Sequence, residues 1–122
     1  IKQNPTFANA YYNLGNILRD QGKTEQAENS YRKAIELDPN FAIAHCNLGT
    51  ICNFQGKTQE AENLYRKAIE LNPNFENAYS NLGKLLIEIG KEKEAFESFL
   101  IAKKLNPSSY QKHFHVNHPN NL

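Results

Sequence analysis

The stretch AYYNLGNILRDQGKTEQAENSYRKAIELDPNF, residues 10–41, sets a pattern that recurs along this chain of 122 residues at an interval of thirty-four. Residues 5–38 and 39–72 are identical at roughly two positions in three, and residues 73–106 keep the same skeleton. A fixed period of this length is typical of a solenoid that stacks one supersecondary unit several times. The sequence therefore predicts a repeat protein.

Each repeat contains two apolar stripes with the spacing of a helix. In the first half of repeat one the stripe is Ala10, Leu14, Ile17 and Leu18. In the second half it is Ala27, Tyr31, Ala34 and Ile35. Positions i, i+4, i+7 and i+8 lie on one face of a helix, so each repeat is predicted to be a pair of amphipathic helices.

Glycine and proline mark the ends of the predicted helices. Gly22, Gly56 and Gly90 separate the two halves of each repeat, where a left-handed residue ends a helix at little cost. Thr24 and Thr58 follow as predicted N-caps of the second helix. The DPNF and NPNF segments end that helix, because proline disfavours helical geometry in the residue before it.

A further glycine lies inside the first helix of every repeat, as Gly15, Gly49 and Gly83. Glycine in a helix interior costs about 1 kcal/mol relative to alanine. A repeated cost indicates close approach of a neighbouring helix that leaves no room for a Cβ atom. We expect the facing small residues to be Ala27, Ala61 and Ala95.

This pattern of large and small residues closely resembles the tetratricopeptide repeat (TPR) family. Repeat one matches it with Tyr11, Leu14, Gly15, Leu18, Ala27, Tyr31, Ala34 and Pro39. Repeat two matches with His45, Leu48, Gly49, Cys52, Ala61, Tyr65, Ala68 and Pro73. Repeat three matches with Tyr79, Leu82, Gly83, Leu86, Ala95, Phe99, Ala102 and Pro107. The resemblance covers residues 5–107. Its weak matches are His45 and Cys52, so we expect repeat two to pack least well.

The resemblance implies an all-α fold, an α-solenoid of three helix-turn-helix units in a right-handed superhelical stack. The predicted repeats are residues 8–41, 42–75 and 76–109. Residues 1–7 align with the end of a repeat and are expected to be the tail of a preceding one. Residues 110–122 are expected to form a short cap, in which Tyr110 and Phe114 cover the last apolar face, or a disordered tail. The chain has no methionine, so we expect a segment of a longer protein.

The resemblance also points to a binding surface, because the first helices of TPR units line a concave groove in which partners bind. An asparagine amide matches the donor and acceptor of a peptide unit. Asn13, Asn47 and Asn81 recur at one groove position and are predicted to hold an extended peptide by its backbone. This is similar to the asparagine ladder of the O-linked N-acetylglucosamine transferases. The residues predicted to tune selectivity are Asn9, Tyr12, Asn16, Asp20, Phe54, Asn77, Lys84 and Glu88. The alternative is that the asparagines satisfy backbone groups between helices.

A carboxylate clamp, by which related co-chaperone domains hold an acidic C-terminal peptide, is disfavoured. Asn16 and Asn47 match its two asparagines. Its basic members would fall at Tyr12, Asn77 and Asn81, and none of these is Lys or Arg. Without such charges a terminal carboxylate loses its main partners.

Composition and motifs exclude other functions. A net charge of +1 favours neither nucleic acid nor an anionic membrane, and there is no apolar run long enough to span a bilayer. Two cysteines that cannot bridge each other along one helix indicate a reducing compartment, and we expect the cytoplasm. No catalytic constellation or cofactor motif occurs within the repeats. Close together in the tail, His113, His115 and His118 lack a predicted scaffold and are not expected to form a metal site.

The sequence thus predicts a non-catalytic module that binds a protein or peptide. One alternative is a substrate-delivering array of a larger enzyme, similar to a glycosyltransferase. Another is a structural scaffold with an empty groove that associates weakly through its exposed ends. The i, i+4 pairs Glu28–Arg32 and Glu62–Arg66 are interpreted as solvated convex surface.

Overall fold

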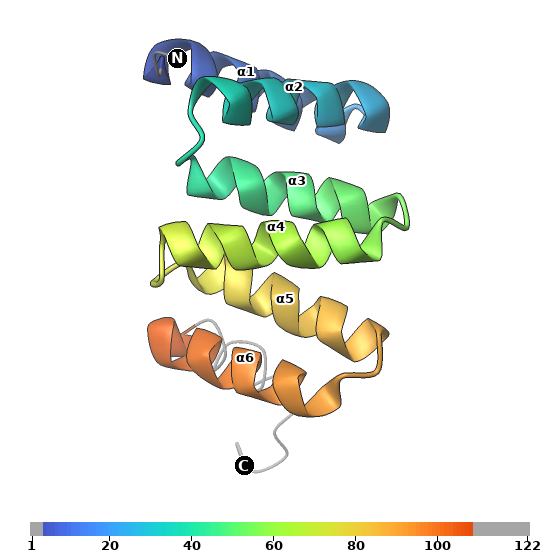
Figure 1. Ribbon diagram of the computed structural model, residues 1–122, viewed down its shortest axis with the longest axis vertical. Coiled ribbons are helices and arrows are strands. Elements are labelled where there is room, and N and C mark those ends of the chain that lie inside the picture. The colour runs from blue at the N-terminus through green and yellow to red at the C-terminus, as the bar shows by residue number, and fades with distance from the viewer. Residues whose placement is uncertain (1–3, 109–122) are drawn as a thin grey trace, which may run out of the picture. The chain divides into compact units, whose positions relative to one another are not determined.

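The computed structural model describes residues 4–108, which form six helices and no strand (Figure 1). They are α1 (Pro5–Asp20), α2 (Thr24–Leu37), α3 (Ala42–Phe54), α4 (Thr58–Leu71), α5 (Glu76–Glu88) and α6 (Glu92–Leu105). Each odd-numbered helix packs against the even-numbered helix that follows it. The predicted all-α fold of three helix-turn-helix units is confirmed.

The chain divides into two compact units. The first unit, residues 1–73, holds α1 to α4, and within it α2 packs against α3 and so joins two repeats. The second unit, residues 74–122, holds the α5–α6 pair. A right-handed stack of all three pairs stays a prediction.

The turn inside each repeat is built by a glycine in the left-handed region, as predicted. Gly22 has a φ of +76°, and its N–H donates to the carbonyl of Arg19 at 2.9 Å. The N–H of Lys23 then donates to the carbonyl of Leu18 at 2.9 Å, which completes a Schellman motif. Gly56 and Gly90 adopt the same conformation in the later repeats.

The predicted threonine N-caps are wrong. Thr24 is the first residue of α2, and Lys23 stands at the N-cap without a side-chain hydrogen bond. The equivalent residues Lys57 and Thr58 behave in the same way in α4. The reason is the shortness of the turn, because the carbonyl of Lys23 already accepts the N–H of Ala27 at 2.9 Å. Lys23 therefore belongs to the Schellman motif that ends α1 and is also the N-cap of α2.

Close approach at the helix-interior glycines is confirmed, but its partner is an aromatic ring and not an alanine. A Cβ atom on Gly15 would lie 2.6 Å from Cε1 of Tyr31 in the paired helix. A Cβ atom on Gly49 would lie 2.9 Å from Cε1 of Tyr65. Gly83 has the same relation to the ring of Phe99 in the second unit. The glycine makes room for the large residue of the second helix.

The first helix begins one turn earlier than the helices equivalent to it. α1 starts at Pro5, whereas α3 and α5 each start three residues after the equivalent proline. The Oδ1 of Asn4 accepts the N–H of Phe7 at 3.2 Å and caps α1. Residues 5–7, expected in the tail of a preceding repeat, therefore lie within α1.

The two unusual residues of repeat two both lie in the interior. Cys52 is fully buried and His45 is also buried. The Nε2 of His45 lies 2.9 Å from the carbonyl of Pro39 and donates to it, since a carbonyl can only accept. The expectation that this repeat packs least well stays a prediction.

No helix within residues 4–108 combines the length and apolar character needed to cross a bilayer. The same residues contain no cluster of three or more metal-ligating side chains. The histidines discounted as a metal site, and the cap predicted at Tyr110 and Phe114, lie outside the described residues.

Candidate functional site

Three of the predicted binding residues meet in one hydrogen-bonded cluster in the first unit. The Nδ2 of Asn47 on α3 donates to Oη of Tyr12 at 3.2 Å and to Oδ1 of Asn16 at 3.1 Å, both on α1. All three side chains are half-buried. The side chain of Asn47 therefore links the first helices of two successive repeats.

The cluster is completed by Tyr31 from α2. Its hydroxyl donates to Oδ1 of Asn16 at 2.5 Å, and burial raises the pKa of this phenol. The ring of Tyr12 lies between the rings of Tyr31 and Phe41, with centroids 6.0 Å and 5.1 Å away. Aromatic packing at these distances holds the Tyr12 hydroxyl where Asn47 meets it.

The hydrogen bonds of Asn47 determine which further hydrogen bonds its side chain can make with a partner. An amide nitrogen has two hydrogens, and both are directed at acceptors on α1. The bonding capacity that remains is that of an acceptor, the oxygen Oδ1. Asn47 in this arrangement can receive the N–H of a peptide unit but has no hydrogen left for its carbonyl.

The same stripe of α3 carries two exposed apolar side chains. Ile43 and Phe54 lie at i−4 and i+7 from Asn47, and Phe54 is 79% exposed. Between them, Thr50 is exposed, and its Oγ1 lies 3.0 Å from Oη of Tyr65, a hydrogen bond in which either hydroxyl can donate. The stripe is thus an uncharged surface with an aromatic ring at one end.

The other predicted residues of the first unit lie apart from this cluster. Asn9 and Asn13 are exposed on α1. Asp20 is exposed at the end of α1, where Nε and Nη2 of Arg19 both lie 3.4 Å from its Oδ1. Asn13 therefore differs from its equivalent Asn47, whose amide nitrogen is bonded.

The remaining predicted residues belong to the second unit. Asn77, Lys84 and Glu88 are exposed on α5, and Asn81 is half-buried. In this repeat Phe99 replaces the tyrosine of the earlier repeats, so the hydroxyl that bonds Asn16 or Thr50 has no counterpart. The ladder of three asparagines across the repeats stays a prediction.

A second polar network corrects the interpretation of Glu28 and Arg32 as solvated surface. Glu28 is buried at 9% exposure, and its Oε2 accepts from Nε of Arg32 at 2.9 Å. Its other oxygen accepts from Nε2 of Gln55 at 2.9 Å, and Nζ of Lys57 lies 3.4 Å from Oε2. The carboxylate therefore bridges α2 and the turn between α3 and α4.

Electrostatics in this network favour the charged carboxylate. Burial raises the pKa of Glu28, but the hydrogen bonds from Gln55 and Arg32, together with the charges of Arg32 and Lys57, outweigh it and lower the pKa below the ordinary value of 4.5. Nη2 of Arg32 also lies 2.8 Å from Oε2 of Glu60 on α4. These ion pairs join repeat one to repeat two.

The equivalent pair Glu62–Arg66 is also not a solvated one. Glu62 is buried at 7% exposure, and its Oε2 accepts from Nε of Arg66 at 3.0 Å. The signal that sequence reasoning missed is the period itself. A charged pair that occupies the same positions of α2 and α4 is typical of a contact that recurs with the repeat.

Sequence reasoning also missed the hydroxyls of Tyr31 and Tyr65. From the sequence, Tyr31 is predicted only as part of the apolar stripe, and Tyr65 only as a large residue of the repeat pattern. Their hydroxyls reach Asn16 and Thr50. The available signal was Phe99, which stands in repeat three where the other repeats have tyrosine. Phenylalanine keeps the ring and lacks only the hydroxyl group.

Comparison with known proteins points to one family. Residues 15–52 match the family described as TPR repeat. Residues 42–75 and residues 64–97 match families described as tetratricopeptide repeat. Together these matches extend over all three helix pairs.

Solved structures share the fold. The first TPR of Spaghetti (RPAP3), bound to the HSP90 peptide SRMEEVD, has a TM-score of 0.87 at 24% identity, over 96% of this chain and 93% of that one. Two crystal structures of MamA have TM-scores of 0.78 and 0.75, each at 28% identity over 88% of this chain. The chain spans 63% and 59% of those MamA chains, less than two thirds of their length.

Proposed function

Because the chain belongs to the tetratricopeptide repeat family, we propose that it is a protein-interaction module that binds an extended, uncharged segment of a partner along α1 and α3. The family is one of non-catalytic interaction modules, and a similarly folded TPR holds a peptide. In the proposed complex the segment lies in the groove that the resemblance assigns to the first helices.

The observation that carries the proposal is the stripe on α3 with Phe54 at its end. A ring that is 79% exposed on a helix is a ready apolar contact for a partner side chain. Asn47 lies two turns earlier, with its donors fixed by Tyr12 and Asn16 and its acceptor remaining. One exposed ring and one oriented acceptor are the two elements that an extended peptide needs, a side-chain contact and a backbone contact.

The charge of the cluster decides the class of partner. Tyr12, Asn16 and Asn47 are all neutral, so the cluster offers no cation to a carboxylate. An acidic C-terminal peptide would lose its hydration there without gaining a charged partner. We therefore propose an uncharged segment with an apolar side chain, and not a peptide of the SRMEEVD type.

The roles proposed for the other predicted binding residues follow from their positions in the repeat. Asn13 and Asn81 occupy the position of Asn47, and we propose that they act as further rungs along the backbone. The exposed side chains proposed to tune selectivity are Asn9, Asp20, Asn77, Lys84 and Glu88. Cys46 and Cys52 are buried and are not part of a disulfide, which supports the cytoplasm as the proposed compartment.

The expected affinity of the peptide determines which binding measurement is suitable. A neutral hydrogen bond contributes about 1 kcal/mol, and burial of an exposed aromatic ring contributes roughly 1.5–3 kcal/mol. Two or three such contacts correspond to a Kd near the millimolar range. Titration of the isotope-labelled chain with peptides, followed by NMR chemical shifts, detects binding of this strength.

The test uses a neutral peptide with one phenylalanine, and SRMEEVD as its acidic counterpart. We expect the neutral peptide to shift resonances of α1 and α3, and Phe54→Ser to weaken binding by about tenfold. Phe96→Ser is the matched control, because Phe96 is 64% exposed but lies on α6. Preference for SRMEEVD, or equal effects of the two substitutions, would contradict the proposal.

A further inference from the structure

One buried ring on α3 lies next to the candidate site in the sequence but takes no part in it. His45 is 7% exposed and stands two residues before Asn47. Tyrosine occupies the equivalent positions of the other repeats, as Tyr11 and Tyr79. Repeat two therefore carries, at this interior position, a side chain that can gain a proton near neutral pH.

The hydrogen bonds of His45 tie it to the turn between α2 and α3, residues 38–41. Nε2 of its ring lies 2.9 Å from the carbonyl oxygen of Pro39, to which it donates. The backbone N–H of His45 donates to the carbonyl oxygen of Phe41, the N-cap residue of α3, at 3.2 Å. The imidazole thus fastens the turn to the first turn of α3.

The same turn also contacts the candidate site. The ring of Phe41 packs against the ring of Tyr12, with centroids 5.1 Å apart. The hydroxyl of Tyr12 accepts from Nδ2 of Asn47 at 3.2 Å. A continuous series of contacts therefore leads from the imidazole of His45, through the turn and Tyr12, to the amide proposed to hold the peptide.

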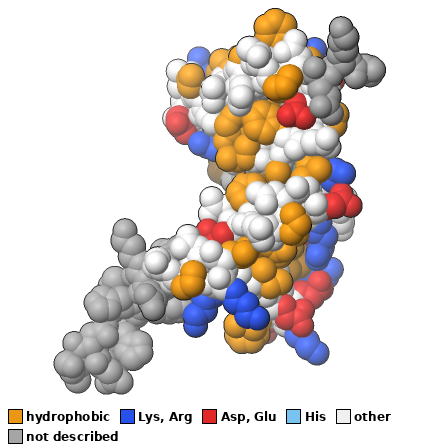
Figure 2. All heavy atoms as spheres, turned by 90° about the vertical axis from the view of Figure 1, so that its left-hand side faces the viewer, with side chains coloured by type: hydrophobic (Ala, Val, Ile, Leu, Met, Phe, Trp, Pro, Cys, Tyr) orange, Lys and Arg blue, Asp and Glu red, His pale blue; other side chains and the backbone are white. Residues whose placement is uncertain are grey.

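The turn that bonds the imidazole lies at the surface. Pro39 and Asn40 are exposed, and Phe41 is half-buried. The turn is on the left-hand side of Figure 1, the side that Figure 2 presents to the viewer, where hydrophobic side chains are visible at the surface. Because this segment is already in contact with water, a displacement of the turn would hydrate the buried ring.

The interior accommodates the neutral ring of His45 better than the protonated one. Nδ1 is buried and has no hydrogen-bond partner among residues 4–108. Protonation would place an N–H there without an acceptor and would also bury a positive charge. The protonated ring is therefore favoured where the turn is displaced and water reaches it.

The surroundings of the ring act on its pKa in both directions. Burial has the largest effect and lowers the pKa of His45 below the ordinary value of 6.5. The hydrogen bond to Pro39 raises the pKa, the charge of Lys67 on α4 lowers it, and the charge of Asp38 in the turn raises it. The charges that face the ring from α4 and from the turn thus oppose each other, and burial decides the direction.

We propose that His45 makes the peptide site sensitive to pH, holding the turn and the contact between Tyr12 and Asn47 in place while its ring is neutral and releasing them when the ring is protonated. This regulation acts on the site of the proposed function and rests on that proposal. The closed arrangement is complete above pH 6.5 and is lost as the pH falls, because the displaced turn leaves the ring free to bind a proton.

The first test is the affinity of the 122-residue chain for the neutral peptide with one phenylalanine, made with blocked ends and measured by NMR at about pH 7.5 and about pH 5.5. The lower pH is about one unit below the ordinary value for histidine, so Kd should rise by about three- to tenfold. Circular dichroism should show the same helix content at both pH values. An unchanged Kd, or loss of helix at the lower pH, would overturn the proposal.

His45→Gln is the control that removes the titration and keeps a donor. The Nε2 of glutamine can donate to the carbonyl oxygen of Pro39, and the amide stays uncharged at both pH values. The Kd of this variant should differ by less than about twofold between them. Because the variant retains His113, His115 and His118, an equal pH dependence would assign the effect to another group and contradict the proposal.

Phe41→Ala tests the route through the turn. It removes the ring that packs on Tyr12 and leaves His45 and Pro39 unchanged. Binding should be weaker at about pH 7.5, and its pH dependence should fall below about twofold. Phe75→Ala is the matched control, since Phe75 is the half-buried N-cap residue of α5, and it should keep the full pH dependence. Full dependence in Phe41→Ala would show that the turn does not connect the two sites.

The side-chain amide resonances of Asn47 provide a measurement without peptide, because their shifts depend on the hydrogen bonds to Tyr12 and Asn16. On acidification they should move toward their positions in Phe41→Ala, and they should stay in place in His45→Gln. Such movement without any peptide binding at about pH 7.5 would refute the proposed function and leave the control by His45 standing. Peptide binding with equal Kd at both pH values and unmoved resonances would refute the control by His45 alone.

Discussion

The amide nitrogen of Asn47 lies 3.1 Å from Oδ1 of Asn16, which stands thirty-one residues earlier and in the preceding repeat. The same nitrogen reaches the hydroxyl of Tyr12. The asparagine that recurs in every repeat thus acts, at this position, as a link between two first helices. A structural and a binding role do not exclude each other here, because its oxygen takes part in neither bond.

We expect Asn47→Ala to lower the free energy of unfolding by about 1–3 kcal/mol, because it removes the half-buried hydrogen bonds to Tyr12 and Asn16. Urea denaturation followed by circular dichroism measures this change. Asn13→Ala is the matched control and should stay within about 0.5 kcal/mol, since Asn13 is exposed. Equal effects would show that the bonds made by Asn47 do not stabilise the fold.

Gly49→Ala should destabilise the chain by about 1–3 kcal/mol, because its methyl group would overlap the ring of Tyr65. The same substitution is then measured in a chain that already carries Tyr65→Ala. The ring is absent from that chain, so the higher helix propensity of alanine at position 49 should make Gly49→Ala neutral or stabilising. Additive effects in this cycle would contradict the steric explanation.

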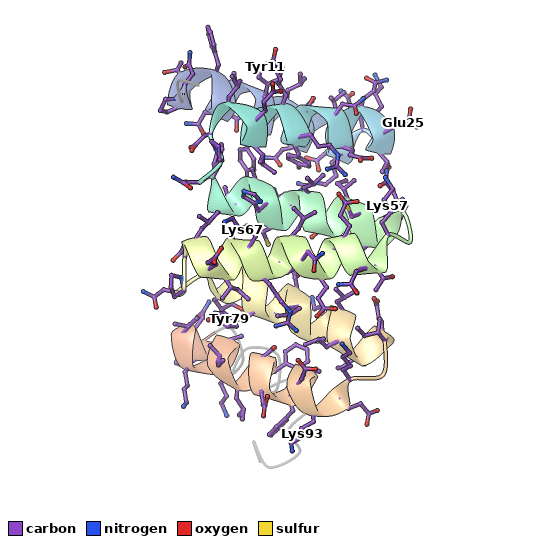
Figure 3. The ribbon with its side chains drawn as sticks, in the orientation of Figure 1. Tyr11, Glu25, Lys57, Lys67, Tyr79 and Lys93 are labelled. Carbon is purple, nitrogen blue, oxygen red and sulfur yellow. The ribbon has the colours of Figure 1, made fainter. Side chains whose placement is uncertain are left out.

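Glu28→Ala should cost about 2 kcal/mol or more, because it leaves Arg32 and Gln55 without a buried acceptor. The control is Glu25→Ala, in the first turn of the same helix, whose side chain is exposed (Figure 3). That substitution should stay within about 0.5 kcal/mol. A loss of similar size at Glu25 would indicate a general effect of helix charge and not of the network.

His45 should make stability depend on pH. Burial lowers the pKa of this imidazole below its ordinary value of 6.5, although the hydrogen bond to Pro39 opposes the shift. Between the lowered pKa and 6.5 the unfolded chain binds a proton that the folded chain does not, so stability falls as pH falls. Its contribution is complete above pH 6.5.

The measurement is Tm against pH for the chain and for His45→Tyr, which places at this position the residue found at Tyr11 and Tyr79. The Tm of the chain should fall more steeply below pH 6.5 than that of the variant. The limit for one group is a slope of about 1.4 kcal/mol per pH unit. Parallel curves would mean that the protonated imidazole is accommodated in the fold.

Much of the fold could be predicted because the same types of residue recur at the same positions of three repeats. Gly22 and its equivalents recur at a spacing that only a turn explains, and they adopt the left-handed conformation. The helix pairs followed from the apolar stripes. The partner of Gly15 did not, because periodicity shows that a position is crowded but not which side chain fills the space.

The site was less accessible to sequence reasoning. The stripe containing Asn47 and Phe54 followed from helical spacing and from the family resemblance. The bonds of Asn47 to Tyr12 and Asn16 depend on how successive repeats are set against each other, which a single repeat does not encode. The burial of Glu28 was missed for the same reason, since an i, i+4 pair gives the same pattern on an exposed or a covered face.

Two thiols lie on α3, which packs against α2 and α4. Cys46 is 2% exposed and Cys52 is fully buried, and burial raises the pKa of Cys52. An alkylating reagent attacks the thiolate and needs access to the sulfur. Modification of these cysteines therefore requires α3 to separate from its neighbours, and its rate reports how often the first unit opens.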